Sequence, residues 1–228
     1  RRATLGRPGV VQRPEFAWGR IVADPPESRQ GASTYFHVIY EGDGRTDGYV
    51  TYRIRGDTLV VYELMAASEE AYAALWRFCF GVDLRTTTEA QNRPVDDPLP
   101  WMLADPRRLR RSIRDGFWLR LVDVRAALAG RHYANDESLV IEVADSYCPW
   151  NRGCFKLEGG PEGAQCKPTT GSPDLALAAA DLAATYLGAV RFTTLSHAGR
   201  AEERTPGALK RADAMFSTGI QPWCPYDW

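Results

Sequence analysis

Three consecutive β-rich segments, followed by one amphipathic helix, constrain the fold of this chain more than any other feature. Residues 34–40, 47–55 and 58–66 are rich in β-branched and aromatic side chains, and the second segment alternates between the two sets of positions expected of a strand. The dipeptide Gly56-Asp57 between the second and third segments is typical of a tight hairpin. The segments are therefore expected to form an antiparallel meander.

The helix after the meander has a clear beginning and end. Ser68 is a suitable N-cap, Gly81 a suitable end, and the apolar residues between them fall on one face of a helix. An earlier helix is expected from about Pro14 to Asp24, and a short strand near residues 86–90. A further helix is expected from residue 97, with Leu103, Leu109 and Ile113 on its apolar face.

The second part of the sequence predicts a smaller sheet with helices. A turn at Asp115-Gly116 leads into an expected strand at 117–122, and Asp123 is an N-cap for a short helix. The remaining expected elements are strands at 138–144, 153–158, 164–168 and 190–194 and helices that begin at Ser172-Pro173 and Thr205-Pro206. The predicted fold class is α+β, with one domain over residues 1–114 and another over 115–228.

The charge and cysteine content exclude several classes of function. The net charge is −1, from 28 basic and 29 acidic residues, so no global field favours nucleic acid or an anionic membrane. The basic run from Arg107 to Arg114 is interpreted as a solvated helix face, with nucleic-acid contact as the alternative. The five cysteines form no CxxC pair and the three histidines are scattered, so no metal site is expected. No apolar run is long enough for a membrane span, and reduced thiols in a cytoplasm are expected.

The last ten residues are unusually aromatic for a tail. Trp223, Tyr226 and Trp228 lie within six residues, and two prolines stiffen the segment. Burial of this segment would place the α-carboxylate of Trp228 beside the carboxylate of Asp227. Desolvation and a neighbouring negative charge both raise the pKa of a carboxyl group, which makes its carboxylate a better base. The alternative is an aromatic plug over a hydrophobic core.

The order of elements in the first part resembles the acetyl-CoA-binding half of the GNAT acetyltransferase fold. In that fold a glycine-containing loop before the helix holds the pyrophosphate of the cofactor. Here the junction at residues 64–70 has no glycine, and Glu69 and Glu70 occupy the first helical turn, where they would repel a diphosphate. Residues 1–114 are therefore interpreted as an incomplete, non-catalytic GNAT-like domain.

The whole chain resembles the C-terminal part of an Eis-family acetyltransferase, a family known as the enhanced intracellular survival proteins of actinobacteria. The resemblance is carried by short stretches spread over the chain. They are Ala74-Leu-Trp-Arg, Gly81-Val-Asp83, Asp97-Pro-Leu-Pro100, Leu103-Ala-Asp105, Asp115-Gly-Phe-Trp-Leu-Arg120, Val124 to Tyr133, Thr185-Tyr-Leu-Gly188 and the aromatic-acidic-aromatic end.

The resemblance implies a catalytic GNAT domain upstream of this chain, then the non-catalytic GNAT-like domain, then a domain similar to sterol carrier proteins over residues 115–228. It implies that acetyl-CoA is the co-substrate and is bound by the upstream domain, which is missing here together with the first part of the middle domain. The 228-residue chain alone is therefore expected to be inactive. Family members form homo-oligomers, hexamers among them, and the same is implied here.

The resemblance also assigns site residues. The α-carboxylate of Trp228 matches the family's general base, and Asp227 matches the acidic residue before it. Trp118 matches a tryptophan near the substrate cavity, or else it is a core residue of the strand at 117–122. The acceptors implied are amines, namely aminoglycosides, lysine side chains or polyamine-like molecules.

Two other interpretations stay open at the level of the sequence. Sterol carrier relatives hold apolar lipids in a tunnel, so residues 115–228 could be a lipid or small-molecule binding module without catalysis. The tail speaks against this, because burying Asp227 and a terminal carboxylate beside an aliphatic ligand costs several kcal/mol. A purely structural role in assembly is the third interpretation.

Overall fold

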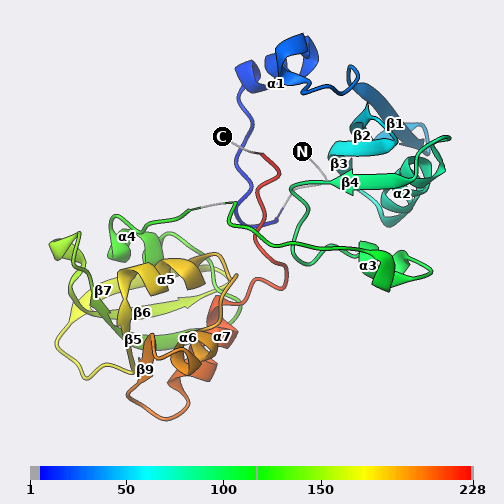
Figure 1. The fold of residues 1–228 in the computed structure, drawn as a ribbon. Helices are drawn as coiled ribbons and strands as arrows, with labels where there is room; N and C mark the ends of the chain where they lie inside the picture. The colour runs from blue at the N-terminus through cyan, green and yellow to red at the C-terminus, as the bar shows by residue number, and fades with distance from the viewer. Residues whose placement is uncertain (1–5, 117, 227–228) are drawn as a thin grey trace. The chain divides into compact units, whose positions relative to one another are not determined.

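The computed structural model describes residues 6–116 and 118–226, and it consists of two compact units (Figure 1). The first unit contains the chain up to Gly116 together with the tail from Trp223, and the second extends to Pro222. Each unit contains helices and its own sheet, which confirms the predicted α+β class. The helix end predicted at residues 1–5 lies outside the described residues.

The sheet of the first unit has the predicted meander. Its strands β1 (Phe36–Gly42), β2 (Arg45–Arg55) and β3 (Thr58–Ala66) pair antiparallel in that order. Strand β4 (Thr87–Ala90) pairs with β3 in parallel and completes the sheet. Gly56 has a φ of 60° in the β2–β3 turn, a backbone conformation that glycine adopts without strain.

Helix α2 (Glu69–Gly81) packs on one face of this sheet. The Ser68 side chain accepts a hydrogen bond from the backbone N–H of Ala71, so the predicted N-cap is confirmed. The helix buries Leu75, Trp76 and Cys79 against apolar strand residues, and these residues together form the core of the unit. Helix α1 (Glu15–Ala23) begins after Pro14, as predicted, and the 3₁₀ helix η2 (Pro26–Ser28) follows it.

A β-bulge in β3 changes which residues face the helix. Thr51 lies opposite Glu63, whereas the next residue, Tyr52, lies opposite Val61, so Tyr62 is the extra residue. Because side chains alternate along a strand, the bulge places Glu63 on the sheet face opposite α2 while Leu64 joins the core. The bulge therefore decides where the only acidic side chain of β3 points.

The helix predicted from residue 97 is much shorter than expected. Helix α3 covers Leu99–Met102, a 3₁₀ helix η3 covers Pro106–Arg108, and the chain is irregular from there to Gly116. Proline lacks the N–H that a helix needs, and Asp105 caps η3 instead of continuing α3. The basic run from Arg107 to Arg114 is therefore exposed to solvent, as predicted, but it is not a helix face, and that part of the prediction was wrong.

The second unit has a sheet with strand order β7-β6-β5-β8-β9 and one apolar core, formed with its helices. The predicted short helix and the three predicted strands that follow it are present, and so is the last helix. The elements in chain order are α4 (Val124–Ala129), β5 (Glu137–Ala144), η4 (Pro149–Asn151), β6 (Gly153–Gly160), β7 (Gly163–Thr169), β8 (Leu175–Ala178), α5 (Ala179–Tyr186), α6 (Phe192–His197), β9 (Ala201–Glu203) and α7 (Ala208–Phe216).

Besides the strand at 117–122, which is described below, two elements of the second unit were predicted wrongly. The helix expected from Ser172 begins only at Ala179, because the four residues before it form strand β8, which pairs in parallel with β5. The strand expected at 190–194 is the start of helix α6. Asp213, on α7, accepts hydrogen bonds from the backbone N–H of Phe192 at 2.5 Å and the hydroxyl of Thr193 at 2.6 Å. This long-range cap satisfies the start of α6 and has no local signal in the sequence.

Candidate functional site

The aromatic tail lies on the first unit, although it follows the second unit in the chain. The Trp223 backbone N–H donates to Pro8 O at 2.9 Å, and its indole Nε1 donates to Asn92 O at 2.8 Å. The guanidinium carbons of Arg7 and Arg93 lie 5.8 Å and 5.7 Å from the Trp223 ring centroid. Trp223 is thus fixed by backbone hydrogen bonds and by two cations.

Tyr226 is held by a buried arginine. The guanidinium carbon of Arg13 lies 3.9 Å from the Tyr226 ring centroid and 4.2 Å from that of Trp18. Only 5% of the Arg13 side chain is exposed. A desolvated guanidinium over an aromatic face is attracted to the ring more strongly than an exposed one.

Glu63 balances the charge of Arg13. Its carboxylate accepts from Arg13 Nη2 at 2.6 Å and from Arg13 Nη1 at 3.4 Å, and from the Tyr49 hydroxyl at 2.6 Å. Burial, and next the charge of Glu63, raise the pKa of Tyr49 well above its usual range. Tyr49 therefore remains a hydrogen-bond donor, and the three side chains form a closed network.

The network of Arg13, Glu63 and Tyr49 was not predicted from the sequence. Arg13 lies just before a helix. Tyr49 belongs to the set of strand positions that alternates with the apolar set, so neither residue stands out in the sequence. One signal was available: Glu63 is the only charged residue in the otherwise apolar segment 58–66. An acid inside a buried strand needs a partner, which would have directed attention to a nearby arginine.

The predicted residues Asp227 and Trp228 lie outside the described residues, so their geometry is not part of this site. What the structure describes is the chain leading to them. Pro225 is buried, and Trp223 and Tyr226 are half-buried. Trp223 and Tyr226, the two anchors of the tail, both belong to the first unit.

The β3–α2 junction does not fit the pyrophosphate of acetyl-CoA. Ser68 already occupies the N-terminus of α2, and Glu69 and Glu70 are in its first turn. Beyond the short pairing of β3 with β4, Arg93 Nη1 donates to Leu64 O at 2.7 Å, and its Nε contacts Asp97 at 2.9 Å. Acidic side chains thus lie in the first turn of α2, where a diphosphate would be repelled, and Arg93 hydrogen-bonds the end of β3.

Trp118 is a surface residue of the second unit. Its side chain is 84% exposed, and no strand forms between it and Asp123. The alternative of a core position is therefore wrong, and so is the predicted strand; its first residue, Phe117, lies outside the described residues.

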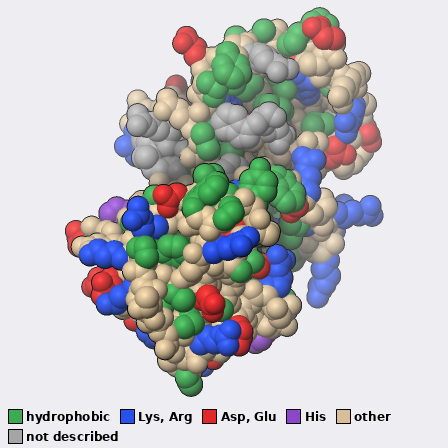
Figure 2. Space-filling view, turned by 90° about the vertical axis from the view of Figure 1, so that its left-hand side faces the viewer, with side chains coloured by type: hydrophobic (Ala, Val, Ile, Leu, Met, Phe, Trp, Pro, Cys, Tyr) green, Lys and Arg blue, Asp and Glu red, His purple; other side chains and the backbone are tan. Residues whose placement is uncertain are grey.

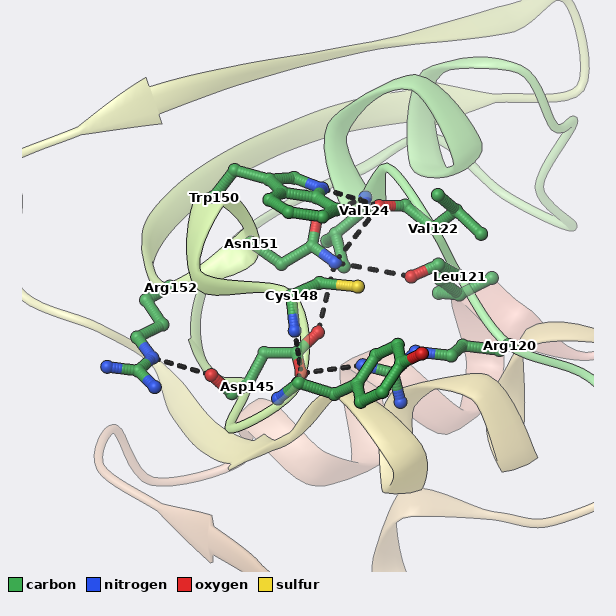
Figure 3. A network of polar contacts seen from close by, with 10 residues as sticks. Arg120, Leu121, Val122, Val124, Asp145, Cys148, Trp150, Asn151 and Arg152 are labelled. Atoms are coloured by element: carbon green, nitrogen blue, oxygen red, sulfur yellow. Dashed lines mark hydrogen bonds and ion pairs between the residues drawn. The ribbon is translucent and has the colours of Figure 1, made fainter.

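Side chains, instead of a neighbouring strand, satisfy the backbone after Trp118 (Figure 3). Asn151 Nδ2 donates to the carbonyls of Leu121 and Val122, each at 3.2 Å, and Trp150 Nε1 also donates to Val122 O. Asn151 Oδ1 accepts from the Val124 N–H at 2.9 Å. These contacts explain why the segment is extended without belonging to a sheet.

Asp145 is the centre of the same network (Figure 3). Its carboxylate accepts hydrogen bonds from the backbone N–H groups of Tyr147 and Cys148, from Asn151 Nδ2 and from Arg120 Nη2. The backbone hydrogen bond from Cys148 is the largest of the effects that lower the pKa of Asp145 far below its usual range. The loop that presents Tyr147 and Trp150 to solvent is therefore held firmly at its base.

The second unit also has an open hollow beside β8 and β9. Charged side chains line much of it, namely Glu142, Arg200, Glu202, Glu203 and Arg204. Figure 2 shows one face of the molecule, on which hydrophobic side chains lie among basic and acidic ones. The charged side chains of the hollow interrupt its apolar lining, whereas a site for an aliphatic ligand is predominantly apolar.

Within residues 6–116 and 118–226, no group of three or more histidine, cysteine or acidic side chains could hold a metal ion. In the same part of the chain, no helix has both the length and the apolar character needed to cross a bilayer.

Two known domain families together match nearly the whole chain. Residues 9–121 match the acetyltransferase (GNAT) domain, and residues 124–225 match the sterol carrier protein domain. An uncharacterized N-acetyltransferase of Streptomyces avermitilis is 43% identical over 99% of this chain. This chain belongs to the proteins that join a GNAT acetyltransferase domain to a sterol carrier protein domain, and it is similar to Eis-type N-acetyltransferases.

Two relatives carry the Eis name. N-acetyltransferase Eis of Mycobacterium tuberculosis is 34% identical over 93% of this chain and 52% of its own length. The crystal structure of Eis1 from Mycobacterium abscessus is 36% identical and superimposes with a TM-score of 0.81 over 97% of this chain. The chain spans 57% of the length of both this structure and the S. avermitilis relative. GNAT domains use acetyl-CoA, but the β3–α2 junction of this chain does not fit it.

Proposed function

We propose that this chain forms part of an acetyl-CoA-dependent N-acetyltransferase and contributes one wall of the amine-acceptor pocket and the catalytic base. The seating of the tail on the first unit supports this proposal most directly. Trp223 and Tyr226 are both anchored there. Tyr226, the last residue that the structure describes, contacts the polar network of Arg13, Glu63 and Tyr49.

In this proposal the α-carboxylate of Trp228 accepts the proton that the attacking amine loses. Asp227 adds a second negative charge that attracts a polycationic acceptor, and Trp118 contributes an aromatic surface for it. Glu63 is neutralised by Arg13, so it does not compete for the amine. The proton acceptor is therefore the end of the chain and not the nearest buried acid.

We propose that residues 1–114 are a non-catalytic GNAT-like domain and residues 115–228 a sterol-carrier-like domain. Two observations support this assignment of domains. The β3–α2 junction has acidic residues where a diphosphate would bind and an Arg93 hydrogen bond at the end of β3, and the chain covers 57% of the S. avermitilis relative. Acetyl-CoA would be held by a further GNAT domain outside this chain, and the 228 residues alone would be inactive. The tyrosine that protonates the departing thiolate would belong to that domain.

The acceptors proposed are aminoglycosides, lysine side chains or polyamine-like amines. Relatives named N-acetyltransferase support an amine acceptor as a class. We propose in addition a cytoplasmic homo-oligomer, with a hexamer as one form.

A lipid or small-molecule binding module without catalysis is the second candidate, favoured by the match of residues 124–225 to a sterol carrier protein domain. The charged lining of the hollow beside β9 speaks against an aliphatic ligand. Thermal unfolding with a fluorescent fatty acyl probe, and separately with kanamycin, distinguishes the two. Stabilisation by the acyl probe alone would favour the binding module.

The direct test is product formation. The chain is incubated with acetyl-CoA and kanamycin, by itself and fused to the part of the S. avermitilis relative that it does not match. Intact mass should show acetylated kanamycin only with the fusion. Product from the 228-residue chain alone would contradict the proposal that acetyl-CoA is bound elsewhere.

A further inference from the structure

We propose that Arg13, Glu63 and Tyr49 form a clamp that docks the tail on the first unit by holding the ring of Tyr226. The docking of the tail by this clamp stands on the contacts alone. Only its effect on catalysis rests on the proposed function, since the residue to be positioned would then carry the base. Arg13, Glu63 and Tyr49 are positioning residues in this proposal, because none of them touches the reacting atoms.

The cost of the buried ion pair is the first argument. Each of the Arg13 and Glu63 side chains is only 5% exposed. Removing two charges from water is expensive, and apolar residues of the same size usually cover a sheet face at no loss of stability. A charged pair at this position is explained if its directional contacts are needed, and the contact that it directs is the one to Tyr226.

The geometry of the arginine is the second argument. A guanidinium is flat, so it can contact an aromatic face and at the same time donate two hydrogen bonds in its own plane. Arg13 does both, with Glu63 as the acceptor and the rings of Trp18 and Tyr226 at 4.2 Å and 3.9 Å. A lysine at this position could pair with Glu63 but could not lie flat against the ring.

The tail has a second anchor besides Tyr226, namely Trp223. Trp223 is tied to Pro8 and Asn92 by its backbone and its indole. Pro225, which lies between the two anchors, is buried and has a fixed φ. Trp223 and Tyr226 are thus both fixed on the first unit, and the clamp supplies the second of these two contacts.

The same sheet offers a matched control. Arg53 pairs with Asp24 at 2.6 Å and lies 3.7 Å from the ring centroid of Tyr35, and its residue is 9% exposed. This is again a buried arginine with a carboxylate and an aromatic ring. Among the described residues its guanidinium contacts are with Asp24, Ser28 and Tyr35 and not with the tail, so Arg53→Lys reproduces the loss of a stacked arginine without touching Tyr226.

The test is the release of C-terminal residues by carboxypeptidase, followed by intact mass on the full chain. Arg13→Lys should release Trp228 about tenfold faster than the unmodified chain, because a desolvated cation–π contact is worth roughly that factor. Arg53→Lys should leave the rate unchanged. Equal rates for the two variants would overturn the clamp.

A second pair of variants leaves the buried ion pair intact. Tyr226→Leu removes the ring and should release Trp228 as fast as Arg13→Lys, whereas Tyr35→Leu removes the ring that contacts Arg53 and should leave the rate unchanged. Slow release from Tyr226→Leu would show that the ring is not the contact that matters, and would also overturn the clamp.

The kinetic consequence is tested in the fusion that carries the acetyl-CoA-binding part. Arg13→Lys should lower kcat with little change in KM for the acceptor, since a misdirected base does not weaken binding. If proteolysis follows the prediction but deletion of Trp228 leaves activity unchanged, the proposed function fails and the clamp stands. A kcat of Arg13→Lys equal to that of Arg53→Lys would remove the catalytic role from the clamp.

Discussion

Glu63 is the residue whose environment differs most from what its position in the sequence suggests. It is a buried acid in an apolar strand, and the β3 bulge directs it toward Arg13 and Tyr49. Removing its carboxylate would leave the Arg13 charge buried without a counter-ion. This makes Glu63 a sensitive probe of the first unit.

We expect Glu63→Ala to lower the free energy of unfolding by about 3–5 kcal/mol, the usual cost of breaking a buried ion pair. Glu89→Ala removes the exposed partner of Arg55 and should cost about 0–1 kcal/mol. Urea unfolding of both variants provides the comparison. Similar losses for the two would show that the Arg13–Glu63 pair is not buried in solution.

Asp145 predicts a dependence on pH. Its pKa is lowered in the folded state, so its contribution to stability is present above the usual carboxyl pKa of 3.8 and is lost as the pH falls below it. Asp145→Asn should therefore lower Tm at pH 7, and the difference from the unmodified chain should narrow below about pH 4. Thermal unfolding followed by circular dichroism measures both. A difference that stays constant from pH 7 to pH 3 would contradict the assigned role.

For the residues of the tail, burial could be predicted from the sequence, but the contacts that hold the tail could not. The aromatic and proline content of the last ten residues indicated burial, because such side chains are rarely left in solvent. Arg13 could not be assigned in the same way, since its partner faces it only because of a bulge. A bulge shifts the alternation of a strand by one residue, and the local sequence of β3 does not specify it.

Among the elements, the meander and α2 were predicted because their signals are local. Alternation, a two-residue turn and a serine cap each act within a few residues. Strand β8 and helix α6 were missed because distant partners define them, β5 for the strand and Asp213 for the helix. Leu175 and Leu177 fit a helix or a strand equally well until β5 is beside them.

Gly48 tests how closely α2 packs on the sheet. A Cβ at this position would lie 2.9 Å from Leu75 Cδ1 and 2.9 Å from the backbone oxygen of Met65. Gly48→Ala should cost about 1–3 kcal/mol, since the backbone oxygen cannot move away. Gly19→Ala on α1 meets nothing within 4 Å and should stabilise by about 0.5–1 kcal/mol. A neutral Gly48→Ala in urea unfolding would mean that the α2 contact is looser than described.

For the whole molecule, the important feature is that the chain returns to its first unit after completing its second. This return could not be predicted from the sequence, because the tail carries no signal for its docking partner. Removal of residues 223–228 should lower the unfolding temperature of the first unit and leave that of the second nearly unchanged. Differential scanning calorimetry would show this as the shift of one of two transitions, whereas an equal shift of both would contradict the assignment of the tail.

In the proposed function the tail brings a carboxylate, and not only aromatic bulk, to the acceptor pocket. The most direct measurement is kcat of the fused enzyme whose Trp228 ends in a carboxamide, made by semisynthesis, against the same enzyme with its natural carboxylate. The amide keeps the indole ring and removes only the charge and the basicity. If the Trp228 carboxylate is the general base, kcat should fall by a factor of about 10²–10⁴, the usual contribution of such a base. A carboxamide enzyme with unchanged kcat would contradict this role.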